Sequence, residues 1–329
     1  MRCARESDPV HWDRDDPGPT EREARAAVTD VIEVEGLTKR FGRLTAVDDV
    51  SFVVRQGEIF GLLGENGAGK TTTLEILEGF QCADRGSVRV LGIDPHSAHR
   101  DWRDRIGLVL QESDFDPVHT VTETVRLFAS FFTHPRDVDE TLAMVGLADK
   151  ARERVGRLSG GQKRRVDVAL GIIGQPDLLF LDEPTTGFDP VARSDFWSVI
   201  EGLRDAGTSI VLTTHYMEEA ERLCDRLAIM AKGRVVAEGT STTLISALGA
   251  TTIRFVLPPN LDVATLGTIT SATFVAREAM AVALLTERVP EVLLRLLTWS
   301  QANGVTLEQL EVVRPTLNDV FLGATGSES

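Results

Sequence analysis

One short stretch, GENGAGKTT at residues 64–72, restricts the possible folds of this chain more than any other part of the sequence. It fits the pattern GxxxxGK[ST], follows the apolar run IFGLL and opens a segment with helical character. Glycines allow successive backbone N–H groups to converge on phosphate oxygens, and the start of a helix adds a favourable dipole. The stretch therefore predicts a strand, a phosphate-binding loop and a helix, in that order.

A loop of this kind assigns a task to each of its residues. We expect Lys70 to reach the β- and γ-phosphate oxygens of a bound nucleotide, and the Thr71 hydroxyl to be a ligand for Mg²⁺, which prefers hard oxygen donors. The residues that would hold the phosphates are Gly64, Glu65, Asn66, Gly67, Ala68, Gly69, Lys70, Thr71 and Thr72.

Two carboxylates end a second apolar run, LLFLDEP, which is typical of a buried parallel strand. Asp182 at its edge is a candidate for binding Mg²⁺, directly or through water. Glu183 should point the opposite way along the strand, where it could polarise the water that attacks a γ-phosphate. Taken alone, the pair could equally be ordinary solvated acids at the end of a strand. The phosphate-binding loop in the same chain favours the functional interpretation.

Three further polar or aromatic residues are weaker candidates. Gln111 ends the predicted strand IGLVLQ, and its amide oxygen could bind Mg²⁺ or a water molecule. His215 ends the predicted strand IVLTTH and could donate a hydrogen bond to the γ-phosphate. Phe41, ahead of the loop, could stack on adenine. Each of these residues would more often be structural if it stood alone.

The periodicity of the chain predicts three regions. Residues 1–30 are charged and contain prolines, so we expect a mostly disordered extension with a short helix near residues 21–28. Strands then alternate with helices up to about residue 240, which predicts an α/β fold, and residues 121–150 have helical spacing. The segment LAIMAKGRVVAEG reads as a hairpin that turns at Lys232-Gly233. Residues 242–329 form a separate, smaller α+β unit.

A second glycine-rich stretch, RLSGGQKRR at residues 157–165, could also hold a phosphate, although the chain already has a better loop for that purpose. GENGAGKTT, Gln111, LSGGQ, LLFLDEP, GFDP and His215 follow one another in this order. In this order the motifs resemble those of the nucleotide-binding subunits of ABC transporters, over about residues 31–240. The resemblance implies a P-loop NTPase of the ABC ATPase type with an antiparallel β-subdomain and a helical subdomain at about residues 115–165.

The resemblance also implies roles for individual residues. Phe41 matches the aromatic A-loop residue, Gln111 the Q-loop and His215 the switch histidine. Two such domains pack head to tail in the family, so that each ATP lies between one phosphate-binding loop and the LSGGQ of the other subunit. The residues that would face the partner's ATP are Ser159, Gly160, Gly161 and Gln162, and Asp189 of GFDP matches the D-loop. Departures such as Glu65, where proline is frequent, remove no catalytic group.

We therefore expect three parts: an extension at 1–30, an ABC ATP-binding domain at 31–241 and an accessory unit at 242–329. The tail TLNDVFLGATG resembles that of the subgroup related to daunorubicin exporters, so the expected function is ATP hydrolysis in an ABC-2 type exporter of a drug or lipid-like substrate. ATP and Mg²⁺ would be the cofactors. The expected partners are a second ATPase subunit, as in a homodimer, and separate transmembrane permease subunits. The chain would act peripherally, at the cytoplasmic face of the cell membrane.

Composition adds limits to these expectations. A formal net charge of −15 argues weakly against nucleic-acid binding, and no window reaches about 18 uninterrupted apolar residues. The three cysteines lack metal-binding spacing, and we expect each to be a small buried residue. Two other functions compete: a soluble ABC protein acting on ribosomes or DNA, and a small-molecule kinase. ABC proteins that act on ribosomes usually have two ATPase domains in one chain, and those that act on DNA carry long coiled-coil insertions. A kinase has no use for LSGGQ.

Overall fold

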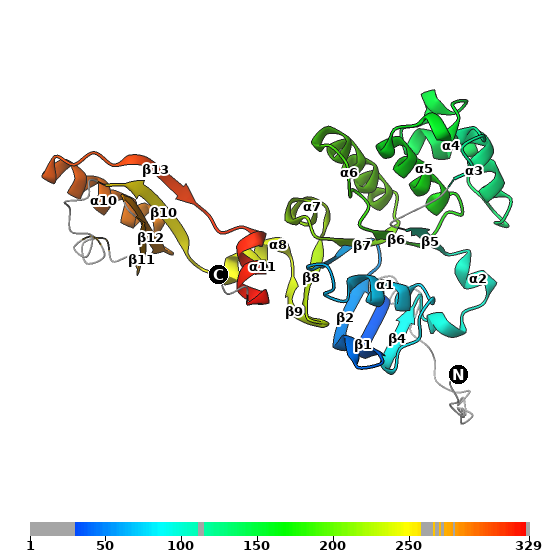
Figure 1. Ribbon diagram of the computed structural model, residues 1–329, viewed down its shortest axis with the longest axis horizontal. Helices are drawn as coiled ribbons and strands as arrows, with labels where there is room; N and C mark the ends of the chain where they lie inside the picture. The colour runs from blue at the N-terminus through cyan, green and yellow to red at the C-terminus, as the bar shows by residue number, and fades with distance from the viewer. Residues whose placement is uncertain are drawn as a thin grey trace, which may run out of the picture.

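A computed structural model of the chain describes residues 30–110, 115–257, 266, 270, 273–278 and 280–326. The predicted extension at residues 1–30 therefore lies almost entirely outside the described residues, as do its short helix and Cys3. Three sheets organise the described part of the chain. Figure 1 shows two of them stacked in one body and the third standing apart at the C-terminal end.

The central sheet has six strands in the order β5-β6-β7-β3-β8-β9. Its first five strands run parallel, and β9 pairs antiparallel with β8. The predicted hairpin is present, because Lys232 and Gly233 both have positive φ angles between β8 and β9. The strand bounds are β3 Ile59–Leu63, β5 Ile106–Val109, β6 Leu178–Asp182, β7 Ser209–Thr214, β8 Arg226–Ala231 and β9 Arg234–Gly239.

The two faces of this sheet bury alternate side chains of the same strands. Phe60 and Leu62 of β3 belong to the core under the three-stranded antiparallel sheet β2-β1-β4 and helix α1, whereas Ile59 and Leu63 belong to the core on the opposite face. Period-two alternation of this kind is what a strand buried on both faces requires. The bounds are β1 Asp30–Phe41, β2 Leu44–Arg55, β4 Arg85–Val90, α1 Lys70–Leu77 and α2 Arg100–Arg103.

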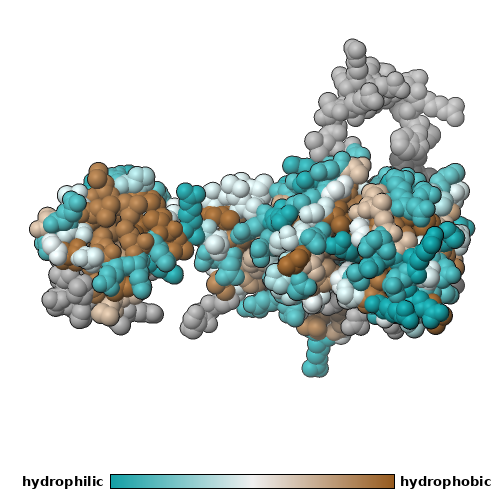
Figure 2. Space-filling view, turned by 90° about the horizontal axis from the view of Figure 1, so that it is seen from above, coloured by the Kyte–Doolittle hydropathy of each residue, from teal (hydrophilic) through white to brown (hydrophobic). Residues whose placement is uncertain are grey.

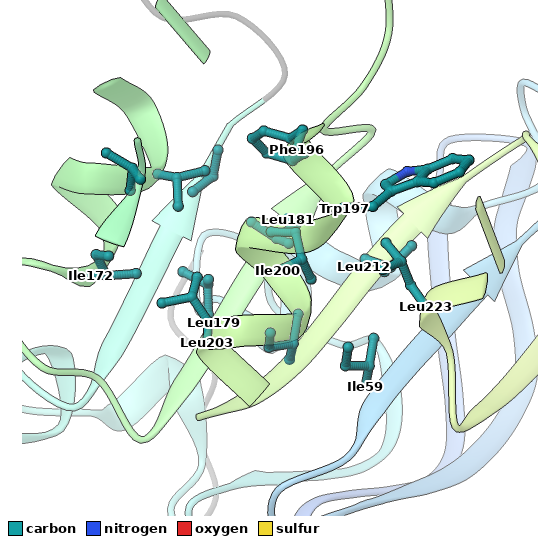
Figure 3. Packing of buried hydrophobic residues seen from close by; sticks show 14 of the residues in the cluster. Ile59, Ile172, Leu179, Leu181, Phe196, Trp197, Ile200, Leu203, Leu212 and Leu223 are labelled. Atoms are coloured by element: carbon teal, nitrogen blue, oxygen red, sulfur yellow. The ribbon is translucent and has the colours of Figure 1, made fainter. Parts of the chain in front are cut away.

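Helices cover the other face of the central sheet (Figure 1). Figure 3 shows α6 lying across β6 and β7, with Phe196, Trp197, Ile200 and Leu203 directed into the core. The predicted helical stretch at 121–150 consists of two α-helices rather than one, since α3 ends before the loop at residues 131–137. The bounds are α3 Val121–Ala129, α4 Val138–Met144, α5 Gly160–Ile172, α6 Pro190–Asp205 and α7 Met217–Leu223.

The C-terminal region forms a four-stranded antiparallel sheet, β11-β12-β10-β13, which packs on helix α10 around its own core. Figure 2 shows an apolar area on the surface of this unit. The exposed large apolar residues of the region include Met280, Leu294, Leu297 and Val312. The bounds are α8 Ser241–Ala247, β10 Thr251–Val256, β11 Thr273–Glu278, β12 Ala281–Thr286, α10 Val289–Asn303, β13 Glu308–Val313 and α11 Leu317–Thr325.

The last helix returns to the main body. Leu317, Val320 and Phe321 of α11 are buried in the same core as β7 and α7. The backbone N–H of Leu317 donates to the Glu221 carboxylate of α7 at 2.8 Å. The chain therefore leaves the main body, forms the third sheet and returns to pack its final helix on the main body.

The cysteines differ from the sequence-based expectation. Cys224 is buried, and burial raises the pKa of its thiol well above the ordinary value. Cys82 is only partly buried, so the expectation was wrong for this residue. It lies in the connection between α1 and β4, and its Sγ is 3.1 Å from Nδ1 of His96. No helix within the described part of the chain is both long and apolar enough to cross a bilayer.

Candidate nucleotide-binding site

The loop at residues 64–69 connects β3 to α1, and two glycines fix its shape. Gly67 has a φ of 83° and Gly69 a φ of 101°, in the region where L side chains are strained. A Cβ on Gly69 would also clash with the carbonyl oxygen of Ala46 in β2. The loop is thus packed against the first hairpin, while its outer residues, Glu65 and Asn66, are exposed.

Lys70 fills the centre of this loop and is only 5% exposed. Its Nζ donates to the carbonyl oxygens of Gly64 at 2.8 Å and Glu65 at 3.2 Å. The same Nζ lies 3.6 Å from Oε1 of Glu183. Thr71, at the start of α1, is exposed, and Thr72 is half-buried. The sequence predicts that the Lys70 ammonium group contacts phosphate oxygens and that the Thr71 hydroxyl is a metal ligand. The first group lies at the centre of the loop, and the second is exposed beside it.

The two acids of LLFLDEP are held by one residue of the neighbouring strand. The Thr213 hydroxyl of β7 donates to Oδ1 of the buried Asp182, and its oxygen accepts the backbone N–H of Glu183 at 3.0 Å. Glu183 lies just beyond the end of β6 and has a φ of 43°. Its orientation therefore follows from this turn, and the alternation of a strand does not extend to it. Sequence reasoning missed Thr213, although parallel pairing of β6 and β7 places it opposite Asp182.

His215 reaches the same carboxylate from the end of β7. Its Nδ1 lies 3.4 Å from Oε1 of Glu183. Nδ1 is buried and makes no hydrogen bond to any described residue, so the pair is close but poorly aligned. The ring packs at 4.1 Å against that of Tyr216. Oε1 of Glu183 thus lies within 3.6 Å of both Lys70 and His215. The sequence predicted that these three residues act together.

The LSGGQ stretch begins helix α5. Ser159 is the N-cap: its Oγ accepts the N–H of Gln162 at 3.3 Å, and Oε1 of Gln162 accepts the N–H of Ser159 at 3.0 Å. Ser159 and Gly160 are exposed. A Cβ on Gly161 would meet Phe188 and Ala192, so the stretch lies beside GFDP. A reciprocal capping box of this kind fixes where a helix starts.

Asp189 of GFDP has a local partner as well. Its Oδ1 accepts the N–H groups of Val191 at 3.0 Å and Ala192 at 2.9 Å, which makes it the N-cap of α6. Asp189 is also exposed at the surface, and its predicted nucleotide contact stays a prediction.

The remaining predicted residues lie at the edges of the site. Phe41 ends β1, is 46% exposed and has the Nζ of Lys39 at 5.4 Å from its ring centroid. An exposed ring at this place is free to stack on a flat ligand. Gln111 falls outside the described residues, so its predicted role stays a prediction.

Arg164 is a buried residue that the sequence reasoning missed. Its guanidinium donates to the carbonyl oxygens of Pro184 at 3.0 Å, Asp182 at 2.8 Å and Leu110, the residue before Gln111. Burial lowers the pKa of this guanidinium, and the carboxylate of Asp167 opposes the shift. These bonds connect helix α5, which begins at LSGGQ, to the end of β6 and to the segment that precedes Gln111. One signal in the sequence indicates that Arg164 is buried. It precedes Val168 by four residues, so both lie on the buried face of the helix.

Glu78, at the end of α1, is a buried acid without a predicted role. Burial, reinforced by the charges of Asp182 and Glu75, raises the pKa of Glu78 to about 8. A carboxyl with such a value is protonated over much of the neutral range. The end of α1 thus adds little negative charge to the site below that pH.

Comparisons with known proteins agree with this geometry. Residues 47–186 match the family described as ABC transporter, and residues 251–316 match the C-terminal domain of ABC transporter domain-containing protein-like proteins. Nod factor export ATP-binding protein I of Ralstonia nicotianae is 46% identical over 224 residues, which cover 66% of this chain and 70% of the relative. The protein of the same name from Mesorhizobium japonicum is 44% identical over 225 residues, 67% of this chain and 66% of the relative.

Solved structures show the same fold. An ATP-binding subunit of an ABC transporter has a TM-score of 0.59 and 28% identity, covering 67% of this chain and 93% of the neighbour. A dimeric ATP-binding cassette in a post-hydrolysis state with ADP and Pi has a TM-score of 0.57 and 25% identity, covering 64% and 98%. The predicted fold class is therefore confirmed. The chain belongs to the ATP-binding subunits of ABC transporters, and it is an ATPase.

Proposed function

We propose that this chain is the ATP-hydrolysing subunit of an ABC-2 type exporter, that ATP joins two copies of it, and that this closure drives separate membrane subunits. One observation carries the proposal. The carboxylate of Glu183 lies between Lys70 and His215, at 3.6 and 3.4 Å, beside a phosphate-binding loop. An acid, a cation and an imidazole around one point suit hydrolysis of a γ-phosphate.

Each of these residues has a defined role in the proposed reaction. Lys70 exchanges its contacts with the loop carbonyls for the β- and γ-phosphate oxygens of ATP. Glu183 orients the attacking water and accepts its proton. His215 donates a hydrogen bond to the γ-phosphate, which suits a ring whose Nδ1 has no hydrogen-bond partner among the described residues. The glycine loop supplies backbone N–H groups to the same phosphates.

Mg²⁺ fits the oxygen donors at the start of α1 and the end of β6. Thr71 offers an exposed hydroxyl, and Asp182 offers a carboxylate held in place by Thr213. Hydroxyl and carboxylate oxygens are hard ligands of the kind that Mg²⁺ selects. With the amide oxygen of Gln111 they form the proposed metal site. When bound, the ion neutralises the charge that develops between the β- and γ-phosphates.

The exposed LSGGQ stretch supports a site shared between two copies. Two side chain–backbone hydrogen bonds join Ser159 to Gln162 within it, and Ser159 and Gly160 at the start of α5 are exposed to solvent. Ser159 and the N–H groups of Gly160 and Gly161 would face the γ-phosphate of the partner's ATP, with Gln162 and Asp189 at the same interface. The dimeric cassette in the comparison set supports this arrangement. Phe41 would stack on the adenine of the chain's own ATP.

The helical subdomain offers a surface for the membrane partner. Leu127, Phe128 and Phe131, at the end of α3, are exposed to 49%, 36% and 57%, and the rings of Phe128 and Phe131 meet edge to face. Exposed apolar groups of this kind mark contact sites. They belong to the subdomain that we propose docks on the permease at the cytoplasmic face of the membrane.

The direction of transport and the substrate class rest on relatives. Proteins named for Nod factor export match two thirds of the chain, which favours export. The tail at residues 316–326 favours the subgroup related to daunorubicin exporters, and hence a drug or lipid-like substrate. We also propose the division into residues 1–30, 31–241 and 242–329, with the qualification that α11 belongs by packing to the main body.

Reconstitution tests this function. The chain is purified together with candidate permeases, which are membrane proteins of about six spans encoded beside its gene, and placed in proteoliposomes. Export is supported when a lipid-like or drug-like dye leaves the inner leaflet only with ATP, and when Leu127→Asp and Phe131→Asp release the chain from the permease. A control, Leu44→Asp, changes a residue of the first hairpin that is 66% exposed and should leave the complex intact. Complete failure of every candidate permease to bind the chain would contradict the proposal.

A further inference from the structure

Glu219, in the first turn of α7, has a role that the proposed catalytic set does not include. Its side chain is 1% exposed, and Oε1 accepts two hydrogen bonds: from the Thr185 hydroxyl at 2.9 Å and from Nε1 of Trp197 at 3.0 Å. Oε2 is buried as well, and no described residue forms a hydrogen bond to it. A buried carboxylate thus serves two donors with one oxygen and leaves the other oxygen unused.

Oε2 of Glu219, which has no hydrogen-bond partner among the described residues, does not add to stability. A buried polar atom without a partner costs free energy, and a carboxylate costs more than a neutral group. A neutral side chain of similar size could fill the same space. An unsatisfied buried group in a native protein calls for another explanation, and function is one such explanation.

The partners of Glu219 indicate which function this is. Thr185 lies two residues after Glu183, and its carbonyl oxygen accepts the N–H of Phe188 at 3.1 Å, in the turn that leads to Asp189. Glu219 itself lies in the first turn of α7, the helix whose N-cap, Tyr216, directly follows His215. Figure 3 shows Trp197 on α6, beside Leu212 and Leu223. One carboxylate therefore joins the segment after Glu183, the helix after His215 and the helix that begins at Asp189.

We propose that Glu219 is a positioning residue, which sets the separation of Glu183 and His215 by fixing the segment of one to the helix of the other. This inference rests on the proposed roles of Glu183 and His215. The Thr185–Glu219 bond closes a short chain of covalent and hydrogen bonds between the two catalytic groups. Loss of the bond lets α7 shift relative to the turn after β6, so that His215 no longer meets the γ-phosphate when Glu183 holds the water. A misplacement of about 1 Å can lower a rate by about 10²-fold.

The test compares four variants of the full chain: Thr185→Val, Glu219→Ala, their combination and Glu219→Gln. Thr185→Val keeps the shape of the side chain and removes the hydroxyl, so it tests the bond even if Glu219→Ala unfolds. Glu218→Ala is the matched control, because Glu218 is the exposed neighbour on the same helix. For each variant kcat, the dissociation constant of ATP and the midpoint of thermal unfolding are measured.

We expect Thr185→Val and Glu219→Ala each to lower kcat by at least about tenfold while ATP affinity changes by less than about twofold. The combined variant should be no slower than Glu219→Ala, because both changes remove the same hydrogen bond between Thr185 and Glu219. Glu219→Gln should retain kcat within about threefold even where it unfolds at lower temperature, since its amide oxygen can accept both donors. Glu218→Ala should match the unaltered chain.

Two results would overturn the inference: an unchanged kcat in Thr185→Val, or losses of kcat that follow thermal stability across all variants, Glu219→Gln included. Glu183→Gln and His215→Ala are measured in parallel to keep the proposals apart. If these two strongly lower kcat while Thr185→Val does not affect it, only the role of Glu219 fails. If they leave hydrolysis intact, the proposed catalytic site fails as well.

Discussion

The carboxylate of Glu183 lies 3.4 Å from Nδ1 of His215, although the two residues come from the ends of different strands. Parallel pairing of β6 with β7 brings these ends to one edge of the sheet. The phosphate-binding loop follows β3, the next strand in the sheet order, so the third component arrives at the same edge. The site is therefore a direct consequence of strand order, as ligand sites at the carboxyl ends of parallel strands generally are.

Replacement of His215 should separate binding from chemistry. We expect His215→Ala to lower kcat by about 10²-fold, because a positioned proton or hydrogen-bond donor contributes on this scale, with little change in ATP affinity. A steady-state ATPase assay combined with equilibrium ATP binding measures both quantities. A variant that hydrolyses ATP at the normal rate would remove His215 from the proposed mechanism.

Lys70→Ala should have the opposite signature. The change removes the ammonium group at the centre of the loop, so ATP affinity should fall by at least about tenfold. Isothermal titration with ATP measures the loss. Lys150→Ala changes a lysine with a 40% exposed side chain, far along the chain; it is the control and should bind as before. Equal affinity in the two variants would show that Lys70 does not contact the phosphates.

The buried acid Glu78 predicts a pH effect on stability. Its pKa is raised from an ordinary 4.5 to about 8. Between these values the unfolded chain loses a proton that the folded chain keeps, so the free energy of unfolding falls as pH rises, by up to about 1.4 kcal/mol per pH unit. Above pH 8 this loss is complete, and below 4.5 it is absent.

Glu78→Gln removes that contribution. Its unfolding midpoint should therefore rise relative to the unaltered chain as the pH goes from 5 to 8. Glu33→Gln, an exposed acid in β1, serves as the control with no such trend. Differential scanning calorimetry at the two pH values decides the matter, and a pH-independent difference for Glu78→Gln would be inconsistent with a buried, protonated Glu78.

The packing of α11 predicts that the C-terminal helix stabilises the main body. Phe321 is 6% exposed in the large core, whereas the neighbouring Leu322 is 46% exposed. Phe321→Ala should lower the free energy of unfolding by about 3 kcal/mol or more, and Leu322→Ala should change it by less than about 0.5 kcal/mol. Urea unfolding is followed by tryptophan fluorescence, to which Trp197 in the same core contributes. Similar losses in both variants would mean that α11 is not held as described.

Much of the fold could be predicted from local sequence. The apolar runs of β3, β6 and β7, the glycine loop and the Lys232-Gly233 turn carry short-range signals that tertiary contacts do not override. The grouping of Glu183 with Lys70 and His215 followed from motif order. TLNDVFLGATG is compatible with an ordinary docking helix as well as with a subgroup-specific tail, and nothing in it says which distant surface will bury Phe321.

The residues that sequence reasoning missed share one property. Arg164, Thr213 and Glu219 act through partners that are close in space and far apart in the chain. Their spacing marks them as helix or strand residues, and their polar partners become visible only when the strands are paired. Burial of Cys82 was predicted from its residue type alone. Residue type does not reveal that Cys82 lies in a partly exposed loop between α1 and β4.

The central claim is that one ATP is held by two copies of this chain, and Glu183→Gln tests it most directly. This variant keeps the shape of the side chain but cannot accept the proton of the attacking water, so bound ATP should persist. Size-exclusion chromatography with light scattering, in saturating ATP and Mg²⁺, should show a dimer that retains ATP. Adding Ser159→Arg to the same chain should return it to a monomer that still binds ATP. A Glu183→Gln chain that binds ATP and stays monomeric would contradict the account.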